Sequence, residues 1–360
     1  MNCVKYILFV IGVLAFMSCN QDEVTEINRS EISFSVRTQG VSRGSVVTTD
    51  GINSSGEQFR VWAYHRTSAS ASQQLYINDL LTYNGTEWRL TENRYWPQGG
   101  FMDFYCVYPV TSLNEINNVG GVLGNGNGVF DYTVSTDLSK QDDLLYATAI
   151  DEQRAKLFAV EPVKLNFRHA LSQVVFSLAL DANFWVKVKE ISVCNIKNEG
   201  TFEMPLITSS ELNSEKADSW GEWTLADGLE NYSVSGNVEL IKGFSNADDK
   251  VETVFSDTDN NPLLLLPQLG EKAVKNGSEW TGVYFKLLCR IDTYAADGFT
   301  PVQLFPEDNI SSDAYGEVVV PLDIDWKQGK KYKYTFRFKE SMFDTIKFSV
   351  TVDEYQTEEL

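Results

Sequence analysis

The chain has 360 residues, with 30 Lys and Arg against 50 Asp and Glu, so its formal net charge at neutral pH is −20. Such an acidic surface argues against nucleic acid and anionic membrane surfaces as partners, and it suits a protein that must stay soluble outside the cell. The length exceeds what one core usually holds, so two domains of about 150–170 residues are expected.

The first element in chain order is an export signal. Lys5 gives a short positive region, and residues 6–17 form an apolar core that ends at Ser18 and Cys19. A membrane-spanning helix needs about 20 apolar residues, so residues 1–18 are predicted to be a secretory signal peptide. A small residue before a lone Cys also fits cleavage by signal peptidase II, which predicts that Cys19 becomes the lipidated N-terminus.

The residues around Cys19 refine this prediction. Phe16 departs from the usual lipobox, where Leu is common three residues before the Cys, so an ordinary secretory signal cut near Cys19 is the alternative. Asp22 and Glu23 resemble the acidic signal that sends lipoproteins of Bacteroidetes-type bacteria to the outer face of the outer membrane. Residues 19–30 would then form a lipidated tether, and the lipid of the outer membrane would be a partner through several acyl chains, because one chain alone binds only marginally.

Period-two alternation of apolar and polar residues dominates the chain after residue 30. In the first run, Ile32, Phe34 and Val36 would all lie on one face of a strand. No comparable run has the spacing of an amphipathic helix, so the chain is predicted to be all-β and built of β-sandwiches. The runs are 31–36, 59–65, 101–108, 144–150, 173–180, 186–194, 282–291, 317–322, 332–339 and 345–352.

A domain boundary is expected near Glu161-Pro162, where a Pro separates two apolar runs. This division gives an N-terminal domain at 31–162 and a C-terminal domain at 163–360. Two long loops rich in Gly, Asn or Asp are expected at 114–128 and 246–261.

Three cysteines follow Cys19, namely Cys106, Cys194 and Cys289, and each lies in an apolar run. A buried free thiol behaves as a small hydrophobic group, and an odd number without close spacing is poor evidence for a disulfide framework or a metal site. We therefore expect free buried thiols, no metal and no cofactor.

Two short patterns resemble functional motifs but lack the context that those motifs need. Gly40-Val-Ser-Arg-Gly44 matches a nucleophile elbow, yet poor helix formers follow it, so a plain loop is favoured. Asp257, Asp259 and Asn261 begin like a calcium-binding loop, but Pro262 and Gln268 stand where Gly and Glu are required, so a solvated loop is favoured.

Catalytic side chains are otherwise scarce or unspecific. The only two histidines are His65, at a strand end, and His169, which is expected to be partly buried at a strand edge. The 50 acidic residues offer many carboxylate pairs of the kind used in glycoside hydrolysis, but sequence separation says nothing about their distance. Most of the eight Trp lie in or beside strand patterns, so core packing is favoured over a sugar-binding platform.

Four motifs in order resemble a known family, the fimbrillins. Arg94-Tyr-Trp-Pro97 followed by 101–109 is similar to a strand pair in their N-terminal domain, and 167–175 is similar to the strand that opens their second domain. The blocks 320–335 and 348–353 resemble their C-terminal motif, although Glu354-Tyr355 stands where the family has Trp. With the lipobox, the resemblance spans most of 19–353.

The resemblance implies two tandem transthyretin-like Greek-key β-sandwiches and a role as a structural or adhesive subunit of surface pili, without enzymatic activity. Partners would be other pilus subunits and a host or bacterial surface ligand. In that family a trypsin-like protease removes the first strand, and a neighbouring subunit supplies a replacement. Here 31–36, with Ile32, Phe34 and Val36, is the candidate leaving strand; Arg43 is the preferred cleavage site and Arg37 the second.

Two other functions compete with this one. A surface lipoprotein that captures glycans would place several Trp or Tyr on one exposed face and would stay an uncut monomer. A glycosidase would need two carboxyl groups about 5–10 Å apart in a cleft.

Overall fold

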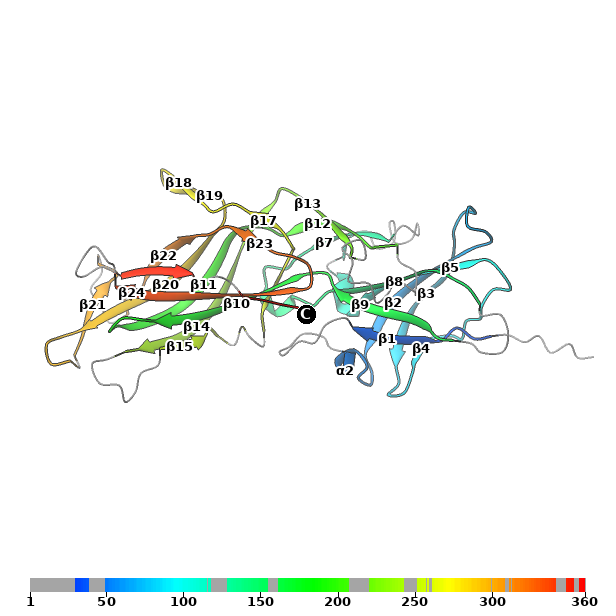
Figure 1. Cartoon of the computed structure of the whole chain (residues 1–360), viewed down its shortest axis with the longest axis horizontal. Helices are drawn as coiled ribbons and strands as arrows, with labels where there is room; N and C mark the ends of the chain where they lie inside the picture. The colour runs from blue at the N-terminus through cyan, green and yellow to red at the C-terminus, as the bar shows by residue number, and fades with distance from the viewer. Residues whose placement is uncertain are drawn as a thin grey trace, which may run out of the picture. The chain divides into compact units, whose positions relative to one another are not determined.

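Strands make up nearly all the regular structure of this protein, as seen in a computed structural model (Figure 1). The helices among the described residues are short: α2 (Thr49–Ile52), η1 (Val110–Asn114) and η3 (Leu138–Lys140). None of the described helices has the length or apolar character needed to cross a membrane. The all-β prediction is therefore confirmed. The structure describes residues 30–38, 49–114, 116–117, 128–154, 161–206, 220–242, 251–256, 258, 261–298, 300–307, 311, 313–340, 348–352 and 356–359.

Seven strands near the N-terminus close into a barrel in the order β1-β4-β3-β2-β5-β8-β9. The closure is uneven, because β1 meets β4 at one residue pair, Phe34 and Trp88, and β8 meets β9 at two. The bounds are β1 (Phe34–Thr38), β2 (Gln58–Arg66), β3 (Gln74–Tyr83), β4 (Trp88–Leu90), β5 (Phe101–Tyr108), β8 (Leu145–Glu152) and β9 (Val163–His169).

The pairing of β9 bears on the boundary expected near Glu161-Pro162. We expected this segment to open the C-terminal domain, but it pairs with β1 over five residues and with β8 at Leu145 and Tyr146. Pro162 separates two apolar runs of the sequence, but this separation does not indicate which sheet the following strand joins. The chain passes to the other sheets after His169, and the division into two domains stays a prediction.

A second sheet, β13-β12-β7-β6, combines strands from both halves of the sequence. Its residue Phe202 packs against Tyr146 of β8, with ring centroids 4.8 Å apart. The Tyr146 hydroxyl accepts a hydrogen bond from the Gly221 N–H at 2.9 Å, and the Thr148 hydroxyl donates to the Pro205 carbonyl at 2.8 Å. The bounds are β6 (Ile116–Asn117), β7 (Val129–Thr133), β12 (Glu199–Glu203) and β13 (Glu222–Leu225).

This covering explains the burial of the barrel strands. In β5, Phe104 and Cys106 belong to the hydrophobic core inside the barrel. Tyr105 and Val107 belong to a second hydrophobic core, which also contains Phe202 of β12. A strand that is buried on both faces is nearly continuously apolar rather than alternating, which matches the sequence of β5.

The C-terminal half contains two larger sheets. One contains β10 (Ser172–Leu180), β15 (Glu252–Val254), β16 (Leu263–Leu265), β24 (Lys330–Glu340), β25 (Phe348–Val352) and β26 (Gln356–Glu359). The other contains β11 (Trp185–Lys197), β14 (Leu229–Ile241), β20 (Tyr284–Tyr294), β21 (Pro301–Phe305) and β22 (Gly316–Pro321). Two short pairs complete the set, β17 (Leu269–Gly270) with β23 (Ile324–Asp325) and β18 (Val274–Asn276) with β19 (Glu279–Thr281).

Aromatic contacts join these two sheets. Phe285 of β20 packs against Phe176 of β10 and against Tyr334 and Phe336 of β24, with ring centroids 4.9–5.9 Å apart. The pairs with Phe176 and Phe336 are edge-to-face, and such aromatic pairs contribute about 0.5–1.5 kcal/mol each beyond their buried area. The sandwich predicted from the alternating runs is thus held by a core that both sheets share.

The three described cysteines are free and buried, as expected. Burial disfavours the charged thiolate, so it raises the pKa of Cys289 to about 12 and that of Cys106 well above its usual value. These thiols act as core side chains.

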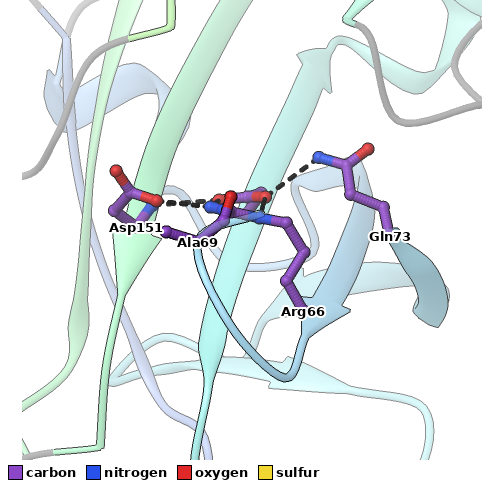
Figure 2. Close-up of polar contacts among 5 residues, drawn as sticks. Arg66, Ala69, Gln73 and Asp151 are labelled. Atoms are coloured by element: carbon purple, nitrogen blue, oxygen red, sulfur yellow. Dashed lines mark hydrogen bonds and ion pairs between the residues drawn. The ribbon is translucent and has the colours of Figure 1, made fainter. Parts of the chain in front are cut away.

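A charged network lies at one end of the barrel (Figure 2). Asp103 of β5, whose side chain is 1% exposed, accepts two hydrogen bonds from Arg66, at 2.7 and 2.9 Å. It also accepts one from Gln73 at 2.9 Å and one from the Asp151 N–H at 3.0 Å. Arg66 in turn donates to the Ala69 carbonyl and to the Asp151 carboxylate. The network therefore ties β2, β5 and β8 together.

Burial by itself would raise the pKa of Asp103, but the hydrogen bonds from Arg66, Asp151 and Gln73 outweigh it and hold that pKa below its ordinary value. The hydrogen bond to Asp103 likewise raises the pKa of Arg66, so both groups stay charged. A carboxylate with a lowered folded pKa stabilises the native state above its unfolded pKa of about 3.9, and that contribution is lost as the pH falls through the folded value.

We predict that Asp103→Asn lowers the free energy of unfolding at pH 7 by about 3 kcal/mol, because it leaves the largely buried Arg66 guanidinium without its main counterion. The difference from wild type should shrink as the pH falls below the unfolded pKa of about 3.9, because the carboxyl of the unfolded chain is then protonated, and it should vanish once the pH passes below the lower folded pKa of Asp103. Urea unfolding followed by circular dichroism at several pH values measures both effects.

The control is Glu87→Gln, which removes an ion pair to Arg89 whose partners are 52% and 67% exposed. Exposed pairs contribute about 0–1 kcal/mol, so this variant should unfold almost like wild type. Equal losses in the two variants would contradict a stabilising role for the buried network.

Candidate functional site

The candidate site is the strand β1 and the groove that holds it. The expected face is present, because Ile32, Phe34 and Val36 are 4%, 7% and 9% exposed. Between them Ser33 is half-buried and Ser35 is exposed. The strand proper is Phe34–Thr38, so it begins later and ends later than the run 31–36 predicts.

Aromatic residues from several strands line the groove. The Phe34 ring meets the edge of Phe104 from β5, with centroids 5.8 Å apart at 85°. Trp96 packs on the same Phe104 ring at 6.1 Å. Because each buried apolar side chain contributes roughly 1.5–3 kcal/mol, the apolar face of β1 is a large part of the stability of this barrel.

The backbone of β1 is hydrogen-bonded mainly on one side. It runs parallel to β9 from Phe34, opposite Val163, to Thr38, opposite Phe167. The Val163 N–H donates to the Ser33 carbonyl at 2.8 Å. This ladder joins two strands that are far apart in sequence, and an extended strand is the element that can add to such a sheet edge.

A small clasp holds the C-terminal end of β1. The Thr38 N–H donates to the Thr49 hydroxyl at 2.9 Å, and the Asn53 amide donates to the Val36 carbonyl at 3.2 Å. Asn53 also accepts a hydrogen bond from the Trp88 indole at 2.8 Å. Sequence reasoning missed Thr49 and Asn53, because a polar residue in a short turn gives no sign of which strand it contacts.

The predicted processing residues divide into two groups. Cys19, Asp22, Glu23 and Arg43 lie outside the described residues. Arg37 lies within β1, where it pairs with Asn166 of β9 and its side chain is exposed. A protease binds an extended segment that has left its sheet, so cleavage after Arg37 would require β1 to come out first.

The motifs weighed for catalysis and metal binding find little support in the described residues. His169, at the end of β9, is 2% exposed, and its Nδ1 lies 2.9 Å from the Asp143 carboxylate. His65 Nε2 lies 2.8 Å from the Gly99 carbonyl. The stretch 40–44 and residues 257 and 259 are outside the described part, within which no group of three His, Cys, Asp or Glu could hold a metal ion.

Among the described residues, the tryptophans form no exposed platform. Trp62, Trp88, Trp96 and Trp326 are buried, at 8% exposure or less. The remaining tryptophans are half-buried: Trp185, Trp220, Trp223 and Trp280. All eight Trp lie within the described residues, and none of them is exposed. Core packing, the interpretation favoured from the sequence, is correct for the four buried ones, and the platform expected of a glycan-capturing lipoprotein does not form from Trp.

Comparison with known proteins places this geometry in a family. The model of the fimbrillin-like family matches residues 46–354. A curated relative, the fimbrium subunit Fim1C of Phocaeicola vulgatus, is 24% identical over an alignment of 380 positions. The alignment covers 96% of this chain and 94% of that protein.

Solved structures give weaker likenesses. A Bacteroides ovatus protein assigned to cell adhesion shares 15% identity at a TM-score of 0.42, covering 91% of this chain and 96% of its own. The tip fimbrial protein Mfa3 of Porphyromonas gingivalis shares 10% identity at a TM-score of 0.37, covering 86% of this chain and 96% of its own. The assignment rests on the family model, which spans most of the sequence: the chain belongs to the fimbrillin-like family.

Proposed function

We propose that this protein is a structural and adhesive subunit of cell-surface pili, without enzymatic activity, which is exported as a lipoprotein and assembled by strand exchange. The proposal rests on family membership and on one structural observation. A short N-terminal strand, β1, fills an apolar groove and pairs with a strand that is distant in sequence, β9.

Strand exchange follows from the physics of that groove. If proteolysis after Arg43 separated β1 from the rest of the chain, its loss would expose the apolar groove and the open ladder of β9. An extended segment from a neighbouring subunit would cover both, because main-chain hydrogen bonds provide affinity and alternate side chains fit the pockets. Cys19, lipidated at the new N-terminus, and the acidic pair Asp22 and Glu23 would bring the subunit to the cell surface beforehand.

The finer fold assignment belongs to this proposal. Two tandem transthyretin-like Greek-key sandwiches are compatible with the two hydrophobic cores. The pairing of β9 with β1 favours a boundary after His169 instead of at Pro162. The alternative of a glycan-capturing lipoprotein with an exposed Trp platform has no supporting observation in the described residues.

We predict that trypsin cuts the native protein first after Arg43 and leaves the rest intact. The cut protein should lose β1 and form oligomers that resist mild detergent, because the vacated groove takes up a strand from another copy. Arg43→Ala should slow cleavage and oligomer formation together. Mass spectrometry identifies the cut, and size-exclusion chromatography follows assembly.

Arg37→Ala is the matched control, since Arg37 is paired within β1 and should not be the site that is cut. A first cut after Arg37 would contradict this assignment of the site. Cut protein that stays monomeric and keeps its thermal midpoint would contradict strand exchange itself.

We also predict that Cys19→Ala releases the protein into the periplasm or the medium, because the acyl chains would be its membrane anchor. Fractionation of cells followed by immunoblotting measures this. Retention of the variant in the outer membrane at the wild-type level would rule out lipidation at Cys19.

Changing Asp22 and Glu23 together to Ala should preserve membrane association but reduce surface exposure, since the pair would act as an export signal and not as the anchor. Antibody binding to intact cells, compared with binding after permeabilisation, measures the exposed fraction. Unchanged antibody access would show that this pair is not the signal.

A further inference from the structure

The chain carries the same short pattern at two hairpin turns. Residues 84–88 read Asn-Gly-Thr-Glu-Trp between β3 and β4, and residues 276–280 read Asn-Gly-Ser-Glu-Trp between β18 and β19. Asn followed by Gly is the pair that loses its side-chain amide most easily, because glycine has no side chain to shield its N–H or to restrict the backbone. The two turns therefore offer one chemistry in two environments. The other Asn-Gly pairs of the sequence, at 125–126 and 127–128, lie outside the described residues except for Gly128.

The first turn holds its asparagine firmly. Asn84 Oδ1 accepts hydrogen bonds from the Thr86 N–H at 2.9 Å, the Thr86 hydroxyl at 2.8 Å and the Glu87 N–H at 2.9 Å. The Asn84 N–H donates to the Glu87 carbonyl at 3.1 Å, and the preceding Tyr83 N–H donates to the Glu57 carbonyl at 2.9 Å. The strands on both sides of this turn belong to the closed barrel. Both the side chain and the backbone of Asn84 are therefore fixed.

The second turn leaves its asparagine unrestrained. The Asn276 side chain is exposed and forms no hydrogen bond with the described residues. Gly277 has a φ of +63°, and no atom lies within 4 Å of the position that a Cβ would take there. The strands β18 and β19 form a two-stranded sheet of their own, which projects from the neighbouring strands (Figure 1). A two-stranded hairpin by itself is marginally stable, so this one opens more often than a turn within the barrel.

We propose that Asn276 is a site of spontaneous deamidation, which proceeds when this hairpin opens. The extended strand holds the Gly277 nitrogen away from Asn276 Cγ, so a backbone rotation must come first. The nitrogen then loses its proton to hydroxide and attacks Cγ, the bond from Cγ to Nδ2 breaks, and the side-chain nitrogen leaves as ammonia. Water adds to one of the two carbonyls of the resulting succinimide ring and breaks its bond to nitrogen, which leaves aspartate or isoaspartate at position 276.

The product changes the hairpin that carries it. Asn276 lies directly opposite Glu279 in the register of β18 and β19. Like charges directly opposite each other on paired strands are destabilising, so a carboxylate at position 276 weakens the pairing. Isoaspartate also adds a methylene group to the backbone, which disturbs the register of every residue before it in β18. Deamidation therefore keeps the hairpin open. This site goes beyond the proposed pilus role and does not depend on it.

Mass spectrometry of the purified uncut protein, incubated in mildly alkaline buffer made with ¹⁸O-labelled water, tests the site. Trypsin then releases Asn276 in the peptide 276–286 and Asn84 in the peptide 67–89, because Lys or Arg flanks each of these segments. The first peptide should show the mass gain of an amide that becomes an acid, with the label from water. This gain should appear at least tenfold faster at Asn276 than at Asn84, which tandem fragmentation locates.

The repeated pattern supplies its own control. In urea the protections of the fold are lost, and Asn84 and Asn276 have nearly the same neighbours in sequence. Their deamidation rates should then agree within twofold. The proposal is overturned if Asn276 of the native protein converts no faster than Asn84. A tenfold difference that persists in urea would also overturn it, because the difference would then come from sequence and not from the stability of the two hairpins.

Two variants at the same position separate the charge from the substitution. Asn276→Asp should raise the hydrogen-exchange rate of the amides in 274–281 at least threefold at neutral pH, since its carboxylate faces Glu279. Asn276→Gln keeps a neutral amide on a longer side chain, so it should exchange like wild type and show no mass gain in the peptide 276–286. Equal exchange in the two variants would contradict the loosening of the hairpin, and a mass gain in Asn276→Gln at the wild-type rate would contradict the assignment to this residue.

Discussion

The N-terminal barrel depends on the pairing of β9 with a strand that is distant in sequence. β9 runs beside β1 over five residue pairs but meets β8 at only two. Along this shared edge, the backbone of β9 pairs mainly with residues 34–38. The apolar side chains of those residues pack into the barrel core. The contacts between β1 and β9 are non-covalent, so under the proposed function a strand from another chain could supply them.

The barrel is also tied to the second half of the chain by burial on its outer face. β5 and β8 carry side chains into both hydrophobic cores, and Tyr146 contacts Phe202 and accepts a hydrogen bond from Gly221. This arrangement packs the outer face of β5 and β8 against the second sheet. Loss of β1 would therefore expose a preformed groove in a barrel that is still supported from outside, and a preformed site binds a new strand without an ordering cost in its walls.

A buried charge in this protein is stabilised by the hydrogen-bond donors around it. Asp103 at one end of the barrel has four hydrogen-bond donors around it, so its charge is stabilising.

The sequence by itself determined the all-β class, the buried free thiols and the single face shared by Ile32, Phe34 and Val36, because alternation and apolar runs are local properties of the chain. It also carried the resemblance to the family. Only the tertiary structure decided that residues 163–169 belong to the barrel and that Thr49 and Asn53 clasp β1. These features depend on contacts between segments far apart in sequence, and local patterns carry no information about which distant strand supplies the partner.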